Sequence, residues 1–281
     1  MPPVIDAQVH AYERDHPGRP WTNVLHGPPE VTGDQMVAAM DEVGVDAAIL
    51  VSPWTMYRFD ASYAIEVQTA HPSRFALVKP IDGRSDDIGY TIGQWSEQRG
   101  AVGVRIMMVP AVPSDPDDPG LNEIVASAGH HGLALNLLCW QRLDQAAELA
   151  RRHPSTQIVI DHLGLQQPFE PPPPDEPWGA LDDVVALAAL DNVAIKVTGA
   201  CTLSREPYPY ADIWEPIRRV VDAFGVGRCM WGTDWTRAVE LLTYRDGVEA
   251  FRRTAEFSDT ERAALMGGTL EAIYRWSPES A

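Results

Sequence analysis

The strongest constraint on the fold is a regular alternation of short apolar runs with longer stretches of helical spacing, repeated eight times in 281 residues. The runs are apolar almost throughout, which is typical of parallel strands covered on both faces. Eight strand–helix units in a row predict an α/β protein, a (β/α)₈ TIM barrel. A doubly wound sheet is the rival architecture. The expected strands are Val4–His10, Asp46–Ser52, Phe75–Ile81, Ala101–Met108, Leu133–Cys139, Gln157–Leu163, Val193–Gly199 and Cys229–Trp235.

Helical spacing marks the segments between these strands, and several begin with residues that commonly cap helices. The capping candidates are Thr32 or Asp34, Asp60, and Ser258 or Asp259. The units fill residues 1–281 without a linker, so we expect a single domain. The expected helices are Thr32–Val43, Ala61–Ala70, Asp86–Gln98, Leu121–His130, Leu143–Arg152, Trp178–Leu190, Ala211–Phe224, Tyr244–Ala255 and Thr260–Trp276.

The connecting segments differ in length according to their direction. Turns from helix into strand are short, whereas four loops from strand into helix are long: Ala11–Val31, Val109–Gly120, Gly164–Pro177 and Ala200–Tyr210. In a barrel these long loops gather at the carboxyl ends of the strands, where we expect the active site. The proline run from Glu170 to Asp175 is either a stiff surface loop or a semi-rigid wall beside that site.

Composition excludes several classes of protein. The chain has 40 acidic and 22 basic residues, a formal charge of −18, which argues against nucleic acid and anionic membranes as partners. Three cysteines are too few for a disulfide framework. The sequence shows neither a secretory signal nor a long apolar run, so a cytoplasmic location is the expectation. A small molecule is the expected partner, and a homodimer is allowed.

Polar side chains gather near the expected carboxyl ends of the strands. A charged or imidazole group inside an apolar strand is costly unless it is paired or functional. An arginine, a histidine and an aspartate at one mouth indicate an acid–base site with an anion anchor. Other interpretations stay open: Asp6 and Asp161 could cap loop backbone, and Lys196 and Arg105 could pair with neighbouring carboxylates. The main candidates are Asp6, Gln8, His10, Lys79, Arg105, Asn136, Asp161, His162, Lys196 and Asp234.

Three segments carry a resemblance to a known family: Ile158–Gly164 with Asp-His-Leu-Gly, Asn192–Gly199, and Phe224–Trp235 with Trp-Gly-Thr-Asp-Trp. Together with the opening Ile5–His10 and Gly103-Val104-Arg105, they resemble the amidohydrolase-related family. Within it they are most similar to the branch of sugar-lactone and 2-pyrone-4,6-dicarboxylate lactonases. The resemblance spans nearly the whole chain and implies the same barrel.

The sequence departs from the family's metal-binding pattern. Many amidohydrolases hold zinc with two strand-1 histidines, a strand-5 histidine and the strand-8 aspartate. Here Gln8 takes the first strand-1 position, and strand 5 has Asn136 instead of histidine. Only His10, His162 and Asp234 remain, a thin set for tight zinc. We therefore expect no required cofactor, although a divalent metal such as zinc is not excluded.

Without a metal, the resemblance implies that Asp234 is the general base and that His162 and His10 polarise a lactone carbonyl. Gln8 has an amide donor and could join that set. Arg105 would bind a substrate carboxylate, and Lys79 is a weaker candidate for the same task. Four aromatic residues, Trp54, Tyr57, Trp140 and Trp235, either wall a cyclic substrate or pack the mouth. The expected substrate is a carboxylated or cyclic small molecule. The rivals are a metal-dependent decarboxylase or hydrolase of the same superfamily, and a non-catalytic binding barrel.

Overall fold

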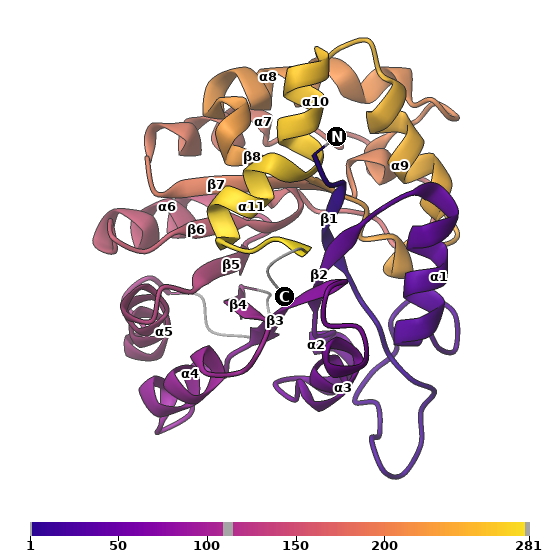
Figure 1. Cartoon of the computed structure of the whole chain (residues 1–281). Helices are drawn as coiled ribbons and strands as arrows, with labels where there is room; N and C mark the ends of the chain where they lie inside the picture. Colours follow the sequence, from indigo (N-terminus) through magenta and orange to yellow (C-terminus); the bar gives the residue numbers. More distant parts are fainter. Residues whose placement is uncertain (1, 109–114, 279–281) are drawn as a thin grey trace.

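The computed structural model describes residues 2–108 and 115–278 and contains eight parallel strands in sequential order. Neighbouring strands are all paired in parallel from β1 to β8, and helices surround them, as in the predicted (β/α)₈ barrel (Figure 1). The strands are β1 Ile5–Val9, β2 Ala47–Val51, β3 Phe75–Pro80, β4 Ala101–Met107, β5 Ala134–Leu138, β6 Ile158–Ile160, β7 Val193–Thr198 and β8 Cys229–Gly232.

The helices agree with the sequence patterns in position, with three differences. A short helix, α2, was not predicted. The segment expected as the helix Trp178–Leu190 is helical only from Leu181. The last predicted helix is divided by a π-helical stretch, Ala264–Gly268, where Gly267 passes against Pro3 so closely that no side chain would fit. The α-helices are α1 Gly33–Val43, α2 Trp54–Tyr57, α3 Ser62–Ala70, α4 Ile88–Ser96, α5 Pro119–His130, α6 Leu143–Arg152, α7 Leu181–Ala186, α8 Trp214–Phe224, α9 Tyr244–Arg253, α10 Asp259–Ala263 and α11 Thr269–Tyr274.

Local capping explains where several helices begin. Thr32 caps α1 and Ser258 caps α10, each forming a capping box with the residue three positions later, Gln35 or Glu261. Each box satisfies backbone N–H groups that have no partner within the helix. Asp60 precedes α3 and accepts a hydrogen bond from the Ser62 backbone N–H, although Ala61 is the capping residue.

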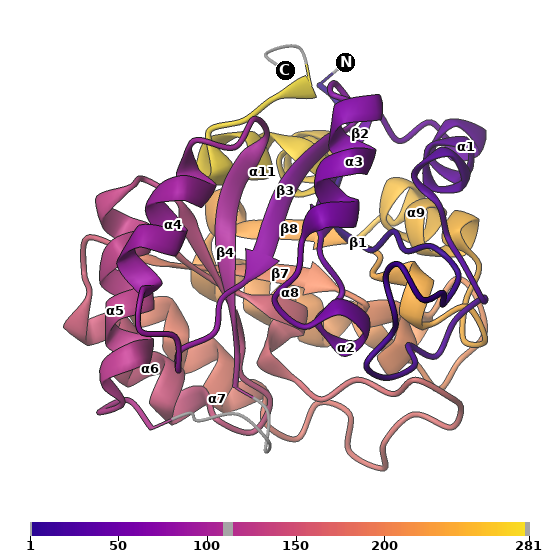
Figure 2. The ribbon, with the colours of Figure 1, turned by 90° about the horizontal axis from the view of Figure 1, so that it is seen from below.

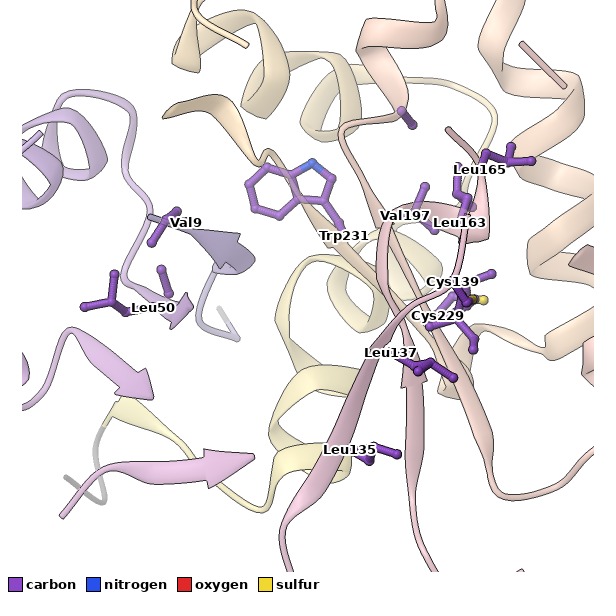
Figure 3. Close-up of a cluster of buried hydrophobic side chains, with 14 of the residues drawn as sticks. Val9, Leu50, Leu135, Leu137, Cys139, Leu163, Leu165, Val197, Cys229 and Trp231 are labelled. Atoms are coloured by element: carbon purple, nitrogen blue, oxygen red, sulfur yellow. The ribbon is translucent and has the colours of Figure 1, made fainter. Parts of the chain in front are cut away.

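Two apolar layers hold the barrel together. The outer layer lies between the strands and the helices and includes Leu50, Leu137, Val197 and Trp231 (Figure 3). The inner layer fills the barrel near the amino ends of the strands, with residues such as Ile49, Val78 and Val159. Alternate residues of each strand face opposite sides, so one strand supplies both layers.

The two ends of the barrel are different. The first and last described residues, Pro2 and Pro278, lie at the amino ends of the strands, where α11 crosses the barrel (Figures 1 and 2). Leu270, Tyr274 and Trp276 belong to the inner apolar cluster there, so this end is closed. The long loops lie at the opposite end, as expected, although residues 109–114 of the predicted loop Val109–Gly120 fall outside the described residues. Within the described residues, no helix is long and apolar enough to cross a bilayer.

The proline-rich loop between β6 and α7 is attached to neighbouring loops. Arg205 donates hydrogen bonds from Nη2 to the carbonyl oxygens of Pro174 and Asp175, at 2.8 and 2.6 Å. The Glu170 carboxylate lies 3.1 Å from His26 Nδ1 in the loop after β1. These contacts tie together three of the loops at the mouth of the barrel.

Candidate active site

A polar cluster lies in the barrel interior toward the carboxyl ends of the strands, above the inner apolar layer. At its centre the Asp161 carboxylate accepts Arg105 Nε at 2.7 Å, Lys196 Nζ at 3.1 Å and Asn136 Nδ2 at 3.2 Å. Tyr274, on α11, donates to Asn136 Oδ1 at 3.0 Å. All five side chains are buried. Burial would raise the pKa of Asp161, but the charges of Lys196 and Arg105 hold it well below its usual range.

The strand predicted to run to Leu163 ends earlier, at Ile160. The backbone of His162 and Leu163 is left-handed, with φ of 54° and 60°. In a continuing strand the side chains of Asp161 and His162 would point to opposite faces. The left-handed turn instead brings both side chains into the polar cluster. There they share Arg105, whose Nε binds Asp161 and whose Nη2 lies 3.4 Å from His162 Nε2.

The contacts of His162 identify its protonated nitrogen. Nε2 faces two N–H donors, Gln8 Nε2 at 3.1 Å and Arg105 Nη2, so it accepts. Gln8 is oriented by its own oxygen, which accepts Lys196 Nζ at 3.0 Å. Nδ1 therefore carries the proton and donates to Thr198 Oγ1 at 2.9 Å. Burial lowers the pKa of His162 to about 3, against the opposing charges of Asp234 and Asp161, so the ring is neutral at physiological pH.

Asp234 follows the end of β8 in a similar turn. The predicted strand to Trp235 stops at Gly232, and Asp234 has a φ of 50°. Its backbone N–H donates to the Gln8 carbonyl at 3.0 Å, which fixes it beside β1. Burial would raise the pKa of Asp234, but the charge of Arg237, with the imidazoles of His162 and His10 nearby, holds it well below its usual range.

The two oxygens of the Asp234 carboxylate have different surroundings. Oδ2 accepts a hydrogen bond from Arg237 Nε and lies 3.6 Å from His162 Nδ1. Among the described residues, none makes a well-formed hydrogen bond to Oδ1, which lies 3.3 Å from His10 Nε2. Oδ1 is thus the oxygen with free lone pairs.

His10 is held by the neighbouring strand. Its Nδ1 donates to the carbonyl oxygen of Val51, at the end of β2, at 2.6 Å, and this bond orients Nε2 toward Asp234. The two imidazoles therefore flank one carboxylate from different sides of the barrel, since His10 directly follows β1 and His162 lies in the turn after β6.

The remaining predicted residues are divided between the cluster and its surroundings. Trp140 lies beside His162, with ring centroids 6.2 Å apart, and its buried Nε1 has no hydrogen-bond partner among the described residues. Trp54 lines a cavity of about 170 Å³ at the ends of β3 and β4. Tyr57 binds the Glu13 backbone, and Trp235 packs on Tyr244. Lys79 lies on the outer face of β3, over the ring of Trp95, away from the polar cluster.

Sequence reasoning missed two residues that contact the cluster. Arg237 binds Asp234, and Gln167 binds Arg237 and the Thr198 carbonyl. Both lie in expected loops, where polar residues are common and carry no periodicity. The position of Arg237, three residues after Asp234, is the only local signal.

These side chains do not fit a tightly bound zinc ion. The Gln8 side-chain oxygen accepts a hydrogen bond from Lys196, and its amide nitrogen faces His162. Gln8 therefore has no free oxygen to bind a metal ion. One Asp234 oxygen is occupied by Arg237. In the described part of the chain, no group of three or more His, Cys, Asp or Glu side chains is arranged to hold a metal ion.

Fold and site together define the class: an α/β barrel with an acid–base cluster at the carboxyl ends of its strands, the place where barrel enzymes have their active sites. A family model described as amidohydrolase matches residues 5–276. The chain therefore belongs to the amidohydrolase family, as its motifs predict.

Individual relatives are more distant. The chain is 32% identical to the L-fucono-1,5-lactonase of Burkholderia ambifaria, over 63% of this chain and 60% of the lactonase. It is 27% identical to the 4-sulfomuconolactone hydrolase of Rhizobium radiobacter, over 94% of this chain and 78% of that one. A crystal structure of an amidohydrolase from Burkholderia multivorans with bound HEPES has a similar fold, with a TM-score of 0.80, 23% identity, and 97% and 99% of the two chains covered.

Proposed function

We propose that this protein hydrolyses a lactone, and that Asp234 activates the water. The observation that carries this proposal is the asymmetry of the Asp234 carboxylate: Oδ2 is held by Arg237, while Oδ1 is free beside His10. A carboxylate that is ionised and oriented, with one oxygen lacking a hydrogen-bond donor, has the features of a general base. The lactonase and lactone hydrolase among its relatives are consistent with this chemistry.

In this mechanism, water gives a proton to Asp234 Oδ1 as its oxygen attacks the lactone carbonyl carbon. The carbonyl oxygen gains negative charge, which N–H groups stabilise. We assign this role to the N–H groups of Gln8 Nε2 and Arg105 Nη2, which lie beside His162. The sequence-based expectation gave it to His162 and His10, but His162 donates its N–H to Thr198 Oγ1 and His10 donates its Nδ1–H to the Val51 carbonyl. The ring C–O bond then breaks, and the proton held by Asp234 passes to the leaving oxygen. The product is an open-chain hydroxy acid.

We propose that no metal ion takes part. Metals serve hydrolases by activating water and by polarising a carbonyl. Here Arg237 is bound to one oxygen of Asp234 and Lys196 is bound to the Gln8 oxygen, so two oxygens that a divalent ion would need already accept hydrogen bonds. This extends the expectation drawn from Gln8 and Asn136, and removal of metal by a chelator tests it.

For the substrate, we propose an uncharged lactone of the sugar type. Each cation of the cluster already has a carboxylate: Arg105 and Lys196 share Asp161, and Arg237 has Asp234. Arg105 still has its Nη atoms to donate to a substrate oxygen, but its charge is largely balanced. A hydroxyl or carbonyl oxygen would suit such a site as well as a carboxylate, and the L-fucono-1,5-lactonase relative points the same way.

The test is hydrolysis of L-fucono-1,5-lactone by the wild type and by Asp234→Asn. We expect turnover to fall by about a thousandfold or more in the variant, since removal of a general base costs 10²–10⁴ and the pair with Arg237 is lost as well. Melting temperature and lactone binding should be retained. Near-normal turnover by Asp234→Asn would remove Asp234 from the mechanism. Release of CO₂ from aromatic carboxylates, with no lactone hydrolysed, would identify a decarboxylase instead.

A further inference from the structure

We propose that Arg237 is a positioning residue that holds the Asp234 carboxylate in the orientation needed for catalysis and joins it to the loop after β6. This inference rests on the proposed function, because it assigns Arg237 to the same reaction. It concerns a residue for which the sequence patterns predicted no role.

Each nitrogen of the Arg237 guanidinium has an acceptor. Nε donates to Asp234 Oδ2, Nη2 donates to Gln167 Oε1, and Nη1 donates to the Pro168 carbonyl at 2.8 Å. The guanidinium carbon also lies 5.4 Å from the centre of the Phe169 ring. Only 4% of the residue is exposed. A planar group bound at three nitrogens and packed against a ring has little freedom to move.

This rigidity determines what Asp234 can do. The backbone of Asp234 is fixed by its left-handed turn and by the bond to the Gln8 carbonyl. Rotation of the carboxylate is the remaining freedom, and the bond from Arg237 to Oδ2 removes it. Oδ1 is thereby kept on the side of His10. Without Arg237, a buried carboxylate would rotate toward other donors, such as His162.

Gln167 extends the connection to the other imidazole. Its Nε2 donates to the Thr198 carbonyl at 2.7 Å, and the Thr198 hydroxyl accepts from His162 Nδ1. One chain of hydrogen bonds therefore runs from Asp234 through Arg237 and Gln167 to the residue that orients His162. Asp234 and the His162 imidazole are thus held in fixed relative positions by Arg237, from the loop after β8, and Gln167, from the loop after β6.

The backbone also makes room for this pair. Gly199 has a φ of +67°, and a Cβ there would lie 2.1 Å from Gln167 Oε1 and 2.8 Å from Arg237 Nη2. The side-chain pair therefore occupies space that only a glycine leaves open. This steric observation is independent of the hydrogen bonds.

A direct role in substrate binding suits Arg237 less well. Its three nitrogens are engaged by protein groups, whereas the Arg105 guanidinium has protein acceptors on fewer of its atoms. We therefore expect a change at Arg237 to affect the rate of the chemical step and to leave binding of the lactone almost unchanged.

The experiment measures kcat and KM of Arg237→Ala, Arg237→Lys and Gln167→Ala on the lactone that the wild type hydrolyses. For Arg237→Ala we expect kcat to fall by about a hundredfold, within the range that a general base contributes, and KM to stay within a few-fold. Millimolar guanidinium chloride should restore at least a tenth of the lost activity, because it fills the vacated space with the same donor. Arg219→Ala, which breaks an exposed pair with Asp182, is the matched control and should behave like the wild type.

Arg237→Lys keeps the positive charge but loses the planar guanidinium group with its three donor nitrogens, so we expect an intermediate kcat with no response to guanidinium. Gln167→Ala should lower kcat by a smaller factor than Arg237→Ala and likewise show no rescue, and it keeps the test decisive if Arg237→Ala does not fold.

An unchanged kcat in all three variants, a raised KM alone, or an absence of rescue in folded Arg237→Ala would each overturn the inference. If Asp234→Asn is inactive while these variants are normal, only the positioning role fails. If Asp234→Asn is active, the proposed function itself fails.

Discussion

At the scale of single residues, the sequence patterns placed His10, Arg105, His162 and Asp234 together because the carboxyl ends of parallel strands meet at one mouth. They could not reveal which atoms meet. Gln8 shows the difference: as a sequence feature it was a missing metal ligand, whereas in the structure it links Lys196 to His162. Arg237 was missed because its contacts depend on the turn that brings Asp234 toward it.

Gln8→Leu provides a test at this scale. The change removes the acceptor of Lys196 and a donor to His162 Nε2, so we expect a loss of about 1–3 kcal/mol in unfolding free energy. We also expect kcat to fall by about tenfold or more, because His162 loses an orienting contact. Urea unfolding and lactone kinetics measure the two effects.

The matched control is Gln68→Leu. Gln68 is equally buried, but its Nε2 has no hydrogen-bond partner among the described residues. Its replacement should change the unfolding free energy by less than about 1 kcal/mol and leave turnover unaltered. Equal losses in the two variants would mean that the contacts of Gln8 contribute nothing specific.

At the scale of elements, the apolar runs located all eight strands but not the ends of β6 and β8. Continuous apolar sequence carries no sign of a left-handed residue, and φ is positive at His162 and Asp234 because their side chains and backbones are bound on several sides. The two misplaced ends are therefore the two places where His162 and Asp234, both in the candidate site, leave the strand geometry.

The seam between β1 and β8 depends on Asp6. Its carboxylate accepts the backbone N–H groups of Gln8 and Thr233 and the Thr233 hydroxyl, at 3.0, 2.9 and 2.6 Å. We expect Asp6→Ala to lower the unfolding free energy by about 2–4 kcal/mol, since buried donors lose their acceptor. Asp6→Asn keeps an acceptor for the backbone and should cost much less.

The same residue gives a pH dependence. Burial raises the pKa of Asp6 to about 6, against hydrogen bonds from Thr233 and Gln8, from an ordinary value of 3.8. The folded state therefore binds the proton more tightly, and this stabilisation is lost as pH rises through about 6. The stability of Asp6→Asn relative to the wild type should increase between pH 4 and pH 6 and then stay level. A constant difference across this range would contradict the assignment.

Gly199→Ala tests the space around Arg237 and Gln167. Gly132 is the control, because it has a similar φ of +69° and open space where a Cβ would lie. Both alanine variants carry the cost of a left-handed alanine, about 1 kcal/mol. Gly199→Ala should lose about 1–3 kcal/mol more and lower kcat, since it displaces both side chains. Equal stabilities and normal kcat in the two variants would show that the loop gives way freely.

At the scale of the whole molecule, the barrel and the family were predictable because many weak signals agree along the chain. The charge of −18 was less informative, since it describes the surface. In the polar cluster of the candidate site, the cations are paired with Asp161 and Asp234, so the net charge of the surface says little about the charge of the site. It bears on the substrate in one respect, because an acidic surface slows the approach of anions and leaves uncharged lactones unaffected.

The central claim is that Asp234, held by Arg237, hydrolyses a lactone without a metal ion. Its most direct test is the turnover of L-fucono-1,5-lactone by wild type and Asp234→Asn, measured before and after chelator treatment, with metal content determined on the same samples. We expect the wild type to be equally active with less than stoichiometric metal, and Asp234→Asn to be inactive in both states. Stoichiometric zinc whose removal abolishes wild-type turnover would contradict the claim.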